Sequence, residues 1–187
     1  MGNKTLNILI IASWYPSKEN PTYGSFIEEQ TQLIQSKGHH VTVLYAALNG
    51  SFKIGQSKKN DSIKRYERNG IPIIEIQRSA VLPKMRQFSY QRLAKTALAE
   101  LQKNDFSNSI DIIHSHALFM GGVIAEYISR KTRTPFFHTE HTSGLINSPE
   151  QYTSRDVLTI SRVLNGAKIA FFVSQFAKEE MVNRYKL

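Results

Sequence analysis

The sequence predicts an α/β fold in which a mainly parallel, Rossmann-like sheet is covered by helices on both faces. Short apolar runs rich in β-branched residues alternate along the chain with segments of helical periodicity. Parallel strands need crossover connections, and the intervening helices supply them. The length of 187 residues suits one core, so we expect residues 1–187 to form a single domain.

The expected elements follow from apolar runs, helical spacing and punctuating residues. Strands are expected at Leu6–Ala12, Val41–Ala47, Ile71–Gln77, Ile110–Ile113, Pro135–Thr139 and Lys168–Val173, the last as a further buried strand. Helices are expected from Gly24 to about Lys37, and at Met85–Lys103, Leu118–Lys131, Ser154–Asn165 and Gln175–Tyr185.

Prolines and glycines set the limits of the first helix. Pro16 and Pro21 exclude a helix between the first strand and Gly24, and Gly38 suits the left-handed position after a helix end.

The segment Asn49–Asn69 is polar, basic and without clear periodicity. We therefore expect a mobile loop there, with at most one short strand at its end.

Composition and charge narrow the function classes without choosing one. The 41% of hydrophobic residues and 21% of charged residues are typical of a soluble globular protein. The chain has no cysteine, which excludes disulfides and thiolate metal sites and favours the cytoplasm. Leu6–Ala12 is far shorter than the ~20 residues that cross a bilayer. The net charge of +9 is compatible with nucleic acid, anionic membranes or phosphate-bearing substrates.

The loop Ser13–Ser25 is the first candidate site, because ligands of open parallel sheets bind beyond the carboxyl ends of the strands. Gly24 and Ser25 open a helix, where free N–H groups and the helix dipole favour an anion such as phosphate. The alternative is that Gly24 only starts the helix. Neither the dinucleotide fingerprint nor the Walker pattern occurs in the sequence.

Histidines follow two later strands. His114 and His116 are two residues apart and should share one face of a strand, whereas Ser115 faces the other way. His138 and His141 flank Glu140, a combination that invites a zinc interpretation. The helical metalloprotease spacing is absent, so we expect no metal and assign these side chains to sugar hydroxyls. Buried histidines satisfied by backbone bonds are the alternative.

Trp14, Tyr15 and Tyr23 lie in the same loop after the first strand. Each combines an apolar ring with a polar tip and is suited to stack on a sugar face. Packing into the core is an equally good explanation for any single one of them.

Three stretches in sequence resemble glycosyltransferase family 4, whose members have the two-domain GT-B fold. The opening NILIIASWYPSKENPTYGSFIEEQTQLIQSKGHHVTVL resembles the family's first strand, substrate loop, first helix and second strand. The stretch DIIHSHALFMGGVIAEYISRKTRTPFFHTEHTSG is similar to its "D-I-I-H-x-H … P-x-x-x-T-x-H" pattern, and AKIAFFVSQFAKEEMVNRY to its "A-D-x-x-x-x-V-S" strand and helix.

The resemblance implies an enzyme that transfers a sugar from a nucleotide-diphosphate sugar to an acceptor hydroxyl, with retention of anomeric configuration and no metal or other cofactor. It implies that the chain is the N-terminal, acceptor-side half of a GT-B architecture. Its partner would be its own C-terminal donor-binding domain, so residues 1–187 alone should be inactive. The acceptor would be a glycan or a lipid-linked glycan of bacterial surface polysaccharide synthesis.

Matching positions assign roles to six residues of the chain. Gly24 and Ser25 would approach the donor diphosphate, and His116 would be the catalytic cleft histidine. Glu140, His141 and Thr142 would lie at the acceptor side. Tyr23-Gly24-Ser25 departs from the double glycine that is commonest in the family.

Two other functions and one further partner remain open from the sequence. Another GT-B enzyme, such as a sugar-nucleotide epimerase, fits the same fold, and a nucleic-acid-binding module fits the charge but lacks a recognised motif. We expect no nucleic acid as a partner. The basic stretches Lys53–Arg68 and Met85–Lys103 suggest peripheral contact with the anionic inner face of the membrane, or only a solvated basic face.

Overall fold

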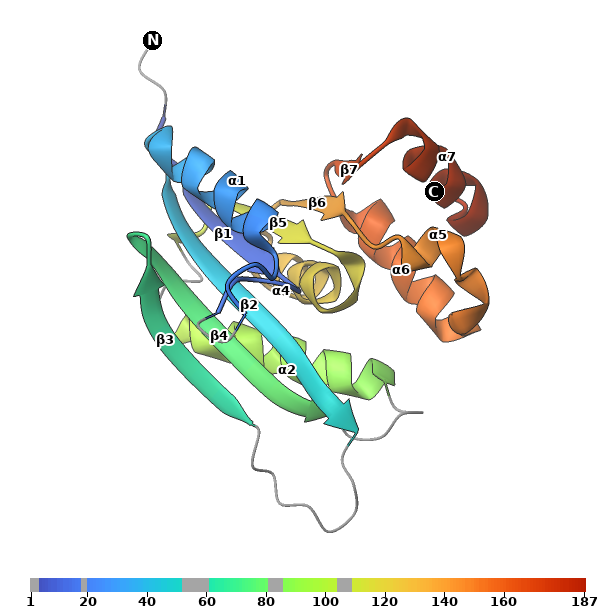
Figure 1. Ribbon diagram of the computed structural model, residues 1–187, viewed down its shortest axis with the longest axis horizontal. Coiled ribbons are helices and arrows are strands. Elements are labelled where there is room, and N and C mark those ends of the chain that lie inside the picture. The colour runs from blue at the N-terminus through green and yellow to red at the C-terminus, as the bar shows by residue number, and fades with distance from the viewer. Residues whose placement is uncertain (1–3, 18–19, 52–60, 81–85, 104–108) are drawn as a thin grey trace.

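The structure is a computed structural model that describes residues 4–17, 20–51, 61–80, 86–103 and 109–187. Within these residues a seven-stranded sheet has the order β3-β4-β2-β1-β5-β6-β7 (Figure 1). All neighbouring strands are parallel except β3 and β4, which are antiparallel. The strands are β1 (Asn7–Ala12), β2 (His40–Ser51), β3 (Ser62–Arg68), β4 (Ile71–Ala80), β5 (Ile112–His116), β6 (Phe136–Glu140) and β7 (Ala170–Phe172).

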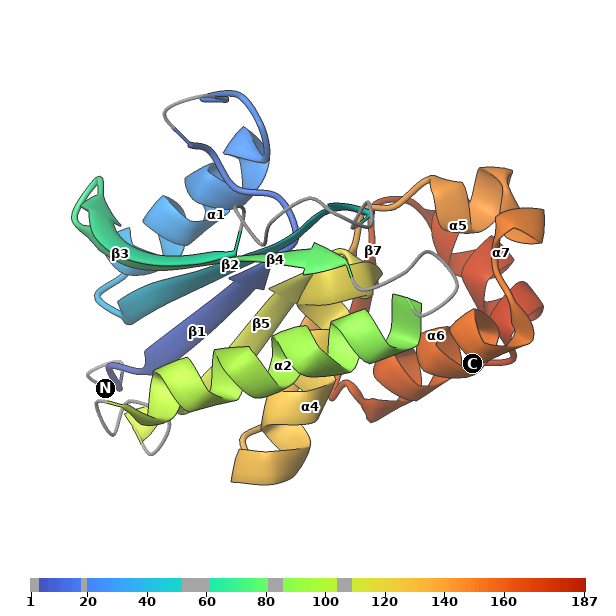
Figure 2. The same ribbon diagram turned by 90° about the horizontal axis from the view of Figure 1, so that it is seen from below.

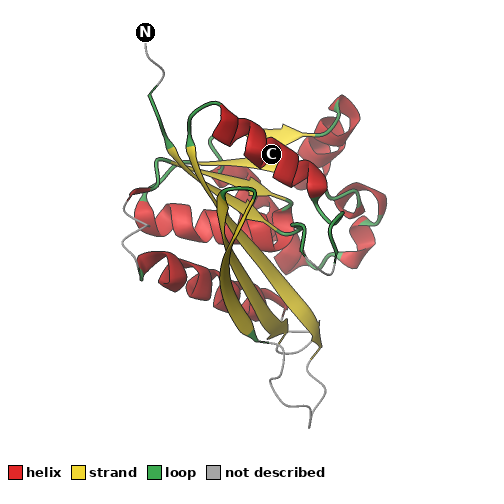
Figure 3. Cartoon of the chain, turned by 60° about the vertical axis from the view of Figure 1, so that its left-hand side comes forward, coloured by secondary structure: helices red, strands yellow, loops and turns green. Residues whose placement is uncertain are grey.

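Helices cover both faces of the sheet, as Figures 2 and 3 show. α1 lies on one face, and α2 and α4 lie on the other. The helices α5 to α7 pack together beside β6 and β7. Their bounds are α1 (Ser25–Ser36), α2 (Arg86–Gln102), α4 (Val123–Thr132), α5 (Gly144–Asn147), α6 (Ser154–Gly166) and α7 (Gln175–Tyr185), with short irregular turns η2 (Leu118–Gly122) and η3 (Pro149–Gln151). The mainly parallel α/β fold is therefore confirmed.

The core has two parts, because alternate residues of a strand point to opposite faces of the sheet. In β1, Leu9 and Ile11 pack toward α2 and α4, whereas Ile8 and Ile10 pack toward α1. The cluster under α2 and α4 is the larger one. Among the described residues, no helix has the length and apolar character needed to cross a membrane.

The predicted loop Asn49–Asn69 ends in β3 (Ser62–Arg68), in agreement with the short strand that was allowed at its end, whereas β2 extends further than predicted, to Ser51. β3 is an edge strand and carries charged side chains, which protect edges from pairing with other chains. Arg65 pairs with Glu100 of α2 and Arg68 pairs with Glu28 of α1. Ion pairs to both helix layers hold this polar segment, and hydrophobic periodicity gave no sign of it. Residues 52–60 lie outside the described part of the chain.

The helix predicted from Leu118 begins only at Val123. The preceding turn η2 contains non-helical residues, and Ala117 and Met120 have positive φ values of 61° and 69°. Gly121 explains the detour, because a Cβ there would lie 2.3 Å from the carbonyl oxygen of His116. The chain must therefore pass close over the end of β5 before it can become helical.

The last strand is shorter and more exposed than expected. β7 has three residues, and the predicted buried run Lys168–Val173 leaves Ile169, Phe171 and Val173 about half exposed or more. β7 lies at the edge of the sheet, so it pairs with a neighbour, β6, on one side only. The prediction of a buried strand was wrong here, because apolar composition alone does not distinguish a central strand from an edge.

Candidate functional site

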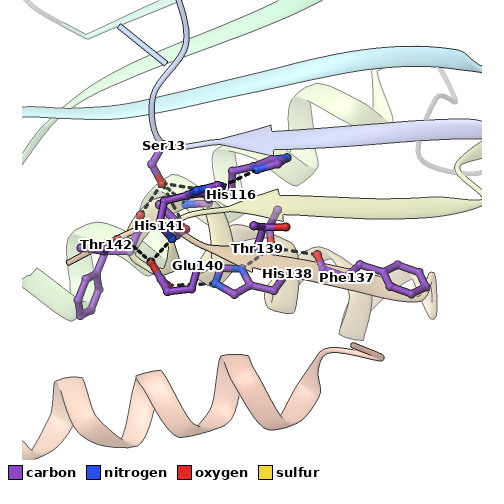
Figure 4. A network of polar contacts seen from close by, with 12 residues as sticks. Ser13, His116, Phe137, His138, Thr139, Glu140, His141 and Thr142 are labelled. Carbon is purple, nitrogen blue, oxygen red and sulfur yellow. Dashed lines mark hydrogen bonds and ion pairs between the residues drawn. The ribbon is translucent and has the colours of Figure 1, made fainter. Parts of the chain in front are cut away.

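The candidate site lies where β1, β5 and β6 end, at one edge of the parallel sheet (Figure 4). Ser13, the first residue after β1, accepts a hydrogen bond from the N–H of Gly121 at 2.9 Å and donates to the carbonyl of Phe119 at 2.6 Å. Its hydroxyl is also 3.3 Å from the carbonyl oxygen of His116. This buried serine thereby fixes the end of β1 to the turn that follows β5.

Three histidine rings lie against one another on the α1 side of the sheet. The ring centroids of His114 and His116 are 4.3 Å apart, which confirms that these residues share a face. His116 and His141 stack with an interplanar angle of 17°, and Nδ1 of His116 is 3.2 Å from Nε2 of His141. His114 uses Nε2 to contact the hydroxyl of Thr139 at 2.8 Å. His116 is only 1% exposed, so His141 is the more accessible member of the pair.

Burial keeps these imidazoles neutral at physiological pH. Desolvation lowers the pKa of His116 to about 2 and that of His114 to about 4, and neighbouring histidines add to both effects. Desolvation also lowers the pKa of His141, although Glu140 opposes the shift. A neutral imidazole has one donor and one acceptor nitrogen. The contact between His116 and His141 therefore joins one N–H to one lone pair and couples their tautomers.

Acid should destabilise the fold through the same imidazoles. Their folded-state pKa values lie below the ordinary value, so the unfolded chain binds protons first as pH falls below about 6.5. Between pH 6.5 and 4.5 each of His114 and His116 should remove about 2 kcal/mol from the free energy of unfolding. Urea unfolding across this range measures the loss. His114→Gln should reduce the pH dependence by one such increment, and an unchanged slope would contradict the assignment.

A second chain of contacts links Ser115, His138 and Glu140, and Figure 4 shows His138 and Glu140 below His116. The hydroxyl of Ser115 is 2.9 Å from Nδ1 of His138, and Nε2 of His138 is 3.1 Å from Oε2 of Glu140. The other oxygen of Glu140 accepts the backbone N–H groups of His141 at 2.9 Å and Thr142 at 2.6 Å. This buried relay therefore fixes the backbone that carries His141.

The electrostatics of Glu140 agree with this holding role. Desolvation raises the pKa of this carboxyl group, but the hydrogen bonds from His138 and Thr142 together outweigh it, so the net pKa is lowered. Glu140 is 4% exposed and both of its oxygens already have partners. Its contacts are with the protein, and it orients the residues on either side of the rim.

Removing the carboxylate of Glu140 should lower the free energy of unfolding. Glu140→Leu leaves three buried N–H groups without their acceptor and should lower the free energy of unfolding by about 3 kcal/mol. Glu126 is a matched control, since it is 8% exposed and its ion pairs within the described residues are with the exposed side chains of Arg130 and Arg162. Glu126→Leu should cost less than about 1 kcal/mol. Equal losses in urea unfolding would rule out the relay.

The N-terminus of α1 reaches the same rim. Gly24 precedes the helix with φ at +77°, and a Cβ there would lie 2.6 Å from the carbonyl oxygen of Trp14. The N–H of Ser25 donates to the carbonyl of Thr22 at 3.3 Å. Phe26 contacts the ring of His141, with centroids 4.8 Å apart. The residues Gly24, His116 and His141 are therefore gathered on one side of the molecule.

The three aromatic residues of the first loop have different surroundings. Tyr15 is 1% exposed and belongs to the core under α1, so the packing alternative holds for it. Trp14 and Tyr23 meet edge to face, with ring centroids 6.4 Å apart, and Tyr23 is 43% exposed. Only these two rings remain near the surface of the rim.

Ser13, Ser115 and His138 were noted in the sequence, but their roles in holding the site together were not predicted. Ser13 is the first polar residue after a buried strand, a signal that could have found it. Ser115 was placed on the opposite face from the histidines, where it meets His138. In the part of the chain that the structure describes, no group of three or more His, Cys, Asp or Glu side chains is arranged to hold a metal ion.

Comparisons with known proteins agree with this geometry. The sequence profile of the family described as "Glycosyltransferase Family 4" matches residues 24–187. The chain is 29% identical over 181 residues to a protein of Bacillus subtilis (strain 168) described as the teichuronic acid biosynthesis glycosyltransferase TuaC. That alignment covers 94% of this chain and 46% of the relative, so the chain spans about half the length of this relative.

Solved structures share the fold at low sequence identity. An α,α-trehalose-phosphate synthase (UDP-forming) from Burkholderia vietnamiensis superposes with a TM-score of 0.61 and 11% identity, over 99% of this chain and 44% of that one. A protein of Listeria monocytogenes described as a UDP-N-acetylglucosamine 2-epimerase gives 0.58 and 11%, over 97% and 42%. These structural similarities confirm the expected GT-B-like α/β fold. The profile match identifies the protein family. The chain belongs to glycosyltransferase family 4.

Proposed function

We propose that this chain is the acceptor-side half of a retaining glycosyltransferase that moves a sugar from a nucleotide-diphosphate sugar to a glycan or lipid-linked acceptor. The observation that carries the proposal is the single rim on which the start of α1 and the pair His116 and His141 meet. The relative described in teichuronic acid biosynthesis supports a role in bacterial surface polysaccharide synthesis. The Listeria monocytogenes protein described as an epimerase shares only its fold with this chain. The profile match is to a glycosyltransferase family, which favours sugar transfer over epimerisation.

The start of α1 is the proposed contact for the donor diphosphate. Gly24 and Ser25 stand at the positive end of a twelve-residue helix, where the dipole and backbone N–H groups attract an anion. Because Gly24 has no side chain, the loop of Trp14 can lie directly against it, and this contact fixes the start of α1 relative to the end of β1.

The two stacked histidines are proposed to act together at the reacting sugar. His141 is the accessible member and would contact a sugar hydroxyl, whereas buried His116 would set the tautomer and orientation of His141. Thr142 continues the same rim and would contact the acceptor. Glu140 would contribute by holding the backbone of His141 and Thr142. Such positioning fits transfer reactions in which stabilising the leaving phosphate matters most.

The donor is proposed to bind mainly to a second, C-terminal domain that closes over this rim. The partly exposed residue Phe171 lies beside the histidines, with its ring centroid 6.4 Å from that of His114, and its neighbours Ile169 and Val173 are exposed as well. Full-length protein should release nucleoside diphosphate from a panel of nucleotide sugars when an acceptor is present. Residues 1–187 alone should show no turnover, and measurable transfer by them would contradict the proposal.

Peripheral contact with anionic lipid at the inner face of the membrane remains part of the proposal, with the chain in the cytoplasm. Its support is the basic side of α2, where Arg86 and Lys95 are exposed. Part of the charge is neutralised, since Arg92 pairs with Asp61 at 3.4 Å. Half of the basic stretch Lys53–Arg68, residues 53–60, and Met85 fall outside the described residues. Sedimentation with anionic and neutral liposomes tests the contact, and equal binding would remove it.

A further inference from the structure

A cavity lies away from the histidine cluster, on the α1 side of β3 and β4. Its volume is about 550 Å³. Pro16 and Ser17 of the loop after β1 form one wall, and residues of the two strands form the rest: Lys64–Arg68 and Glu75. We call it the Tyr66 pocket. Its size is within the range of pockets that hold small organic ligands.

The polar groups of the Tyr66 pocket are fixed before any ligand arrives. The hydroxyl of Tyr66 donates to Glu75 at 3.1 Å, and Nε2 of Gln77 donates to the other oxygen of Glu75 at 2.6 Å. Arg68 is held by Glu28 of α1. Desolvation and the charge of Glu75 raise the pKa of Tyr66 well above its usual value, so the phenol stays neutral. A prearranged pocket loses little entropy on binding.

The side chains suit a sugar ring better than a lipid chain or an isolated anion. The partly exposed ring of Tyr66 offers apolar surface for the C–H face of a pyranose. Ser17 and Lys64 offer donors and acceptors for hydroxyl groups, whereas Glu75 is 5% exposed, has both oxygens bonded within the protein and holds Tyr66 in place. Lys64 is exposed and has no ion pair among the described residues. A lipid chain would leave these charged groups without partners, which is costly.

The pocket lies within reach of the candidate site. Ser13 contacts the carbonyl of His116, and Pro16 of the pocket wall is three residues further along the chain. Three residues span at most about 11 Å. The two places are therefore close enough for a ligand of a few linked sugars to occupy both at once.

We propose that the Tyr66 pocket binds a sugar residue of an oligosaccharide acceptor that lies some units away from the hydroxyl receiving the new sugar. This inference rests on the proposed function and names its acceptor class: a chain of linked sugars. Multiple contacts along one acceptor raise affinity, because the second contact becomes intramolecular. The enzyme would thus prefer longer acceptors over single sugars.

Saturation-transfer NMR on the full-length protein tests the pocket directly. The probes are neutral and uronic-acid oligosaccharides of two to six units, together with the matching single sugars. Tyr66→Ala and Lys64→Ala should weaken oligosaccharide binding at least tenfold, whereas Tyr66→Phe should keep most of it. Lys95→Ala, an exposed lysine of α2, is the matched control and should bind like the unchanged protein.

Two outcomes would overturn the inference: no probe binds, or binding does not depend on Tyr66 and Lys64. Release of nucleoside diphosphate, measured separately, reports on the proposed function. If the enzyme transfers sugar equally well to acceptors of every length, and Tyr66→Ala changes nothing, the proposed role of the Tyr66 pocket is contradicted. The proposed glycosyltransferase activity is then still supported. Oligosaccharide binding that depends on Tyr66, without any transfer, would keep the pocket and remove the proposed reaction.

Discussion

Replacing Gly24 with alanine is expected to lower the rate of sugar transfer by about a hundredfold or more. The new Cβ would lie 2.6 Å from the carbonyl oxygen of Trp14, and backbone atoms cannot yield as a flexible side chain would. The loop after β1 or the start of α1 must then move. Displacing the helix end that is proposed to bind phosphate by as little as about 1 Å has an effect of this size on a positioned reaction. Initial rates of nucleoside diphosphate release measure it.

Gly38 provides the matched control for this prediction. It has a similar left-handed backbone, with φ at +87°, but nothing lies within 4 Å of a Cβ built there. Both substitutions should lower the free energy of unfolding by about 1–2 kcal/mol, because alanine is strained in the left-handed backbone conformation. Gly24→Ala should lower it by about 1–3 kcal/mol more, because its Cβ overlaps the carbonyl of Trp14. Of the two variants, Gly24→Ala alone should lose activity. Equal rates for the two variants would show that the close approach at Gly24 has no part in the reaction.

The sheet could be predicted because its central strands are buried on both faces. Leu6–Ala12 and Val41–Ala47 are continuous apolar runs, and the structure places them as adjacent parallel strands. Parallel order also places the polar residues after β1, β5 and β6 at one edge, so the location of the candidate site followed from the alternation alone.

The exposed and irregular parts could not be predicted by the same reasoning. β3 is held by Arg65 and Arg68, whose ion-pair partners lie 35 and 40 residues away in sequence, and no local pattern encodes such pairs. The turn before α4 depends on a close approach of Gly121 to the end of β5. Both features arise from tertiary contacts.

Burial within the site was the main point that the sequence left undecided. His116 and Glu140 were expected to face a substrate, but they are 1% and 4% exposed, and His141 lies between His116 and the surface. Spacing along a strand tells which face a residue takes, but the layer it occupies depends on the loop that folds over it. That loop is positioned by the relay of Ser115 and His138, whose contacts span 23 residues.

The histidine pair should act as one unit in the transfer reaction. His141→Ala is expected to lower the turnover rate by about 10²–10³, the effect of removing one prearranged hydrogen-bonding group. His116→Ala should produce a similar loss, because the ring of His141 then lacks the partner that fixes its tautomer. The double variant should be hardly worse than either single one, since groups that act together are not additive.

Matched replacements separate a positioning role of His116 from a purely structural one. His116→Asn places a polar nitrogen near the position of Nδ1 and should restore part of the rate, whereas His114→Asn, on the neighbouring ring, should change it less than about threefold. Burial lowers the pKa of His116 to about 2, so His116 does not titrate near pH 6.5. The pH profile of the rate around pH 6.5 should therefore be the same in the unchanged protein and in His116→Asn. Additive losses in the double variant would mean that the two rings act independently, and then the 3.2 Å contact between them would have no part in the reaction.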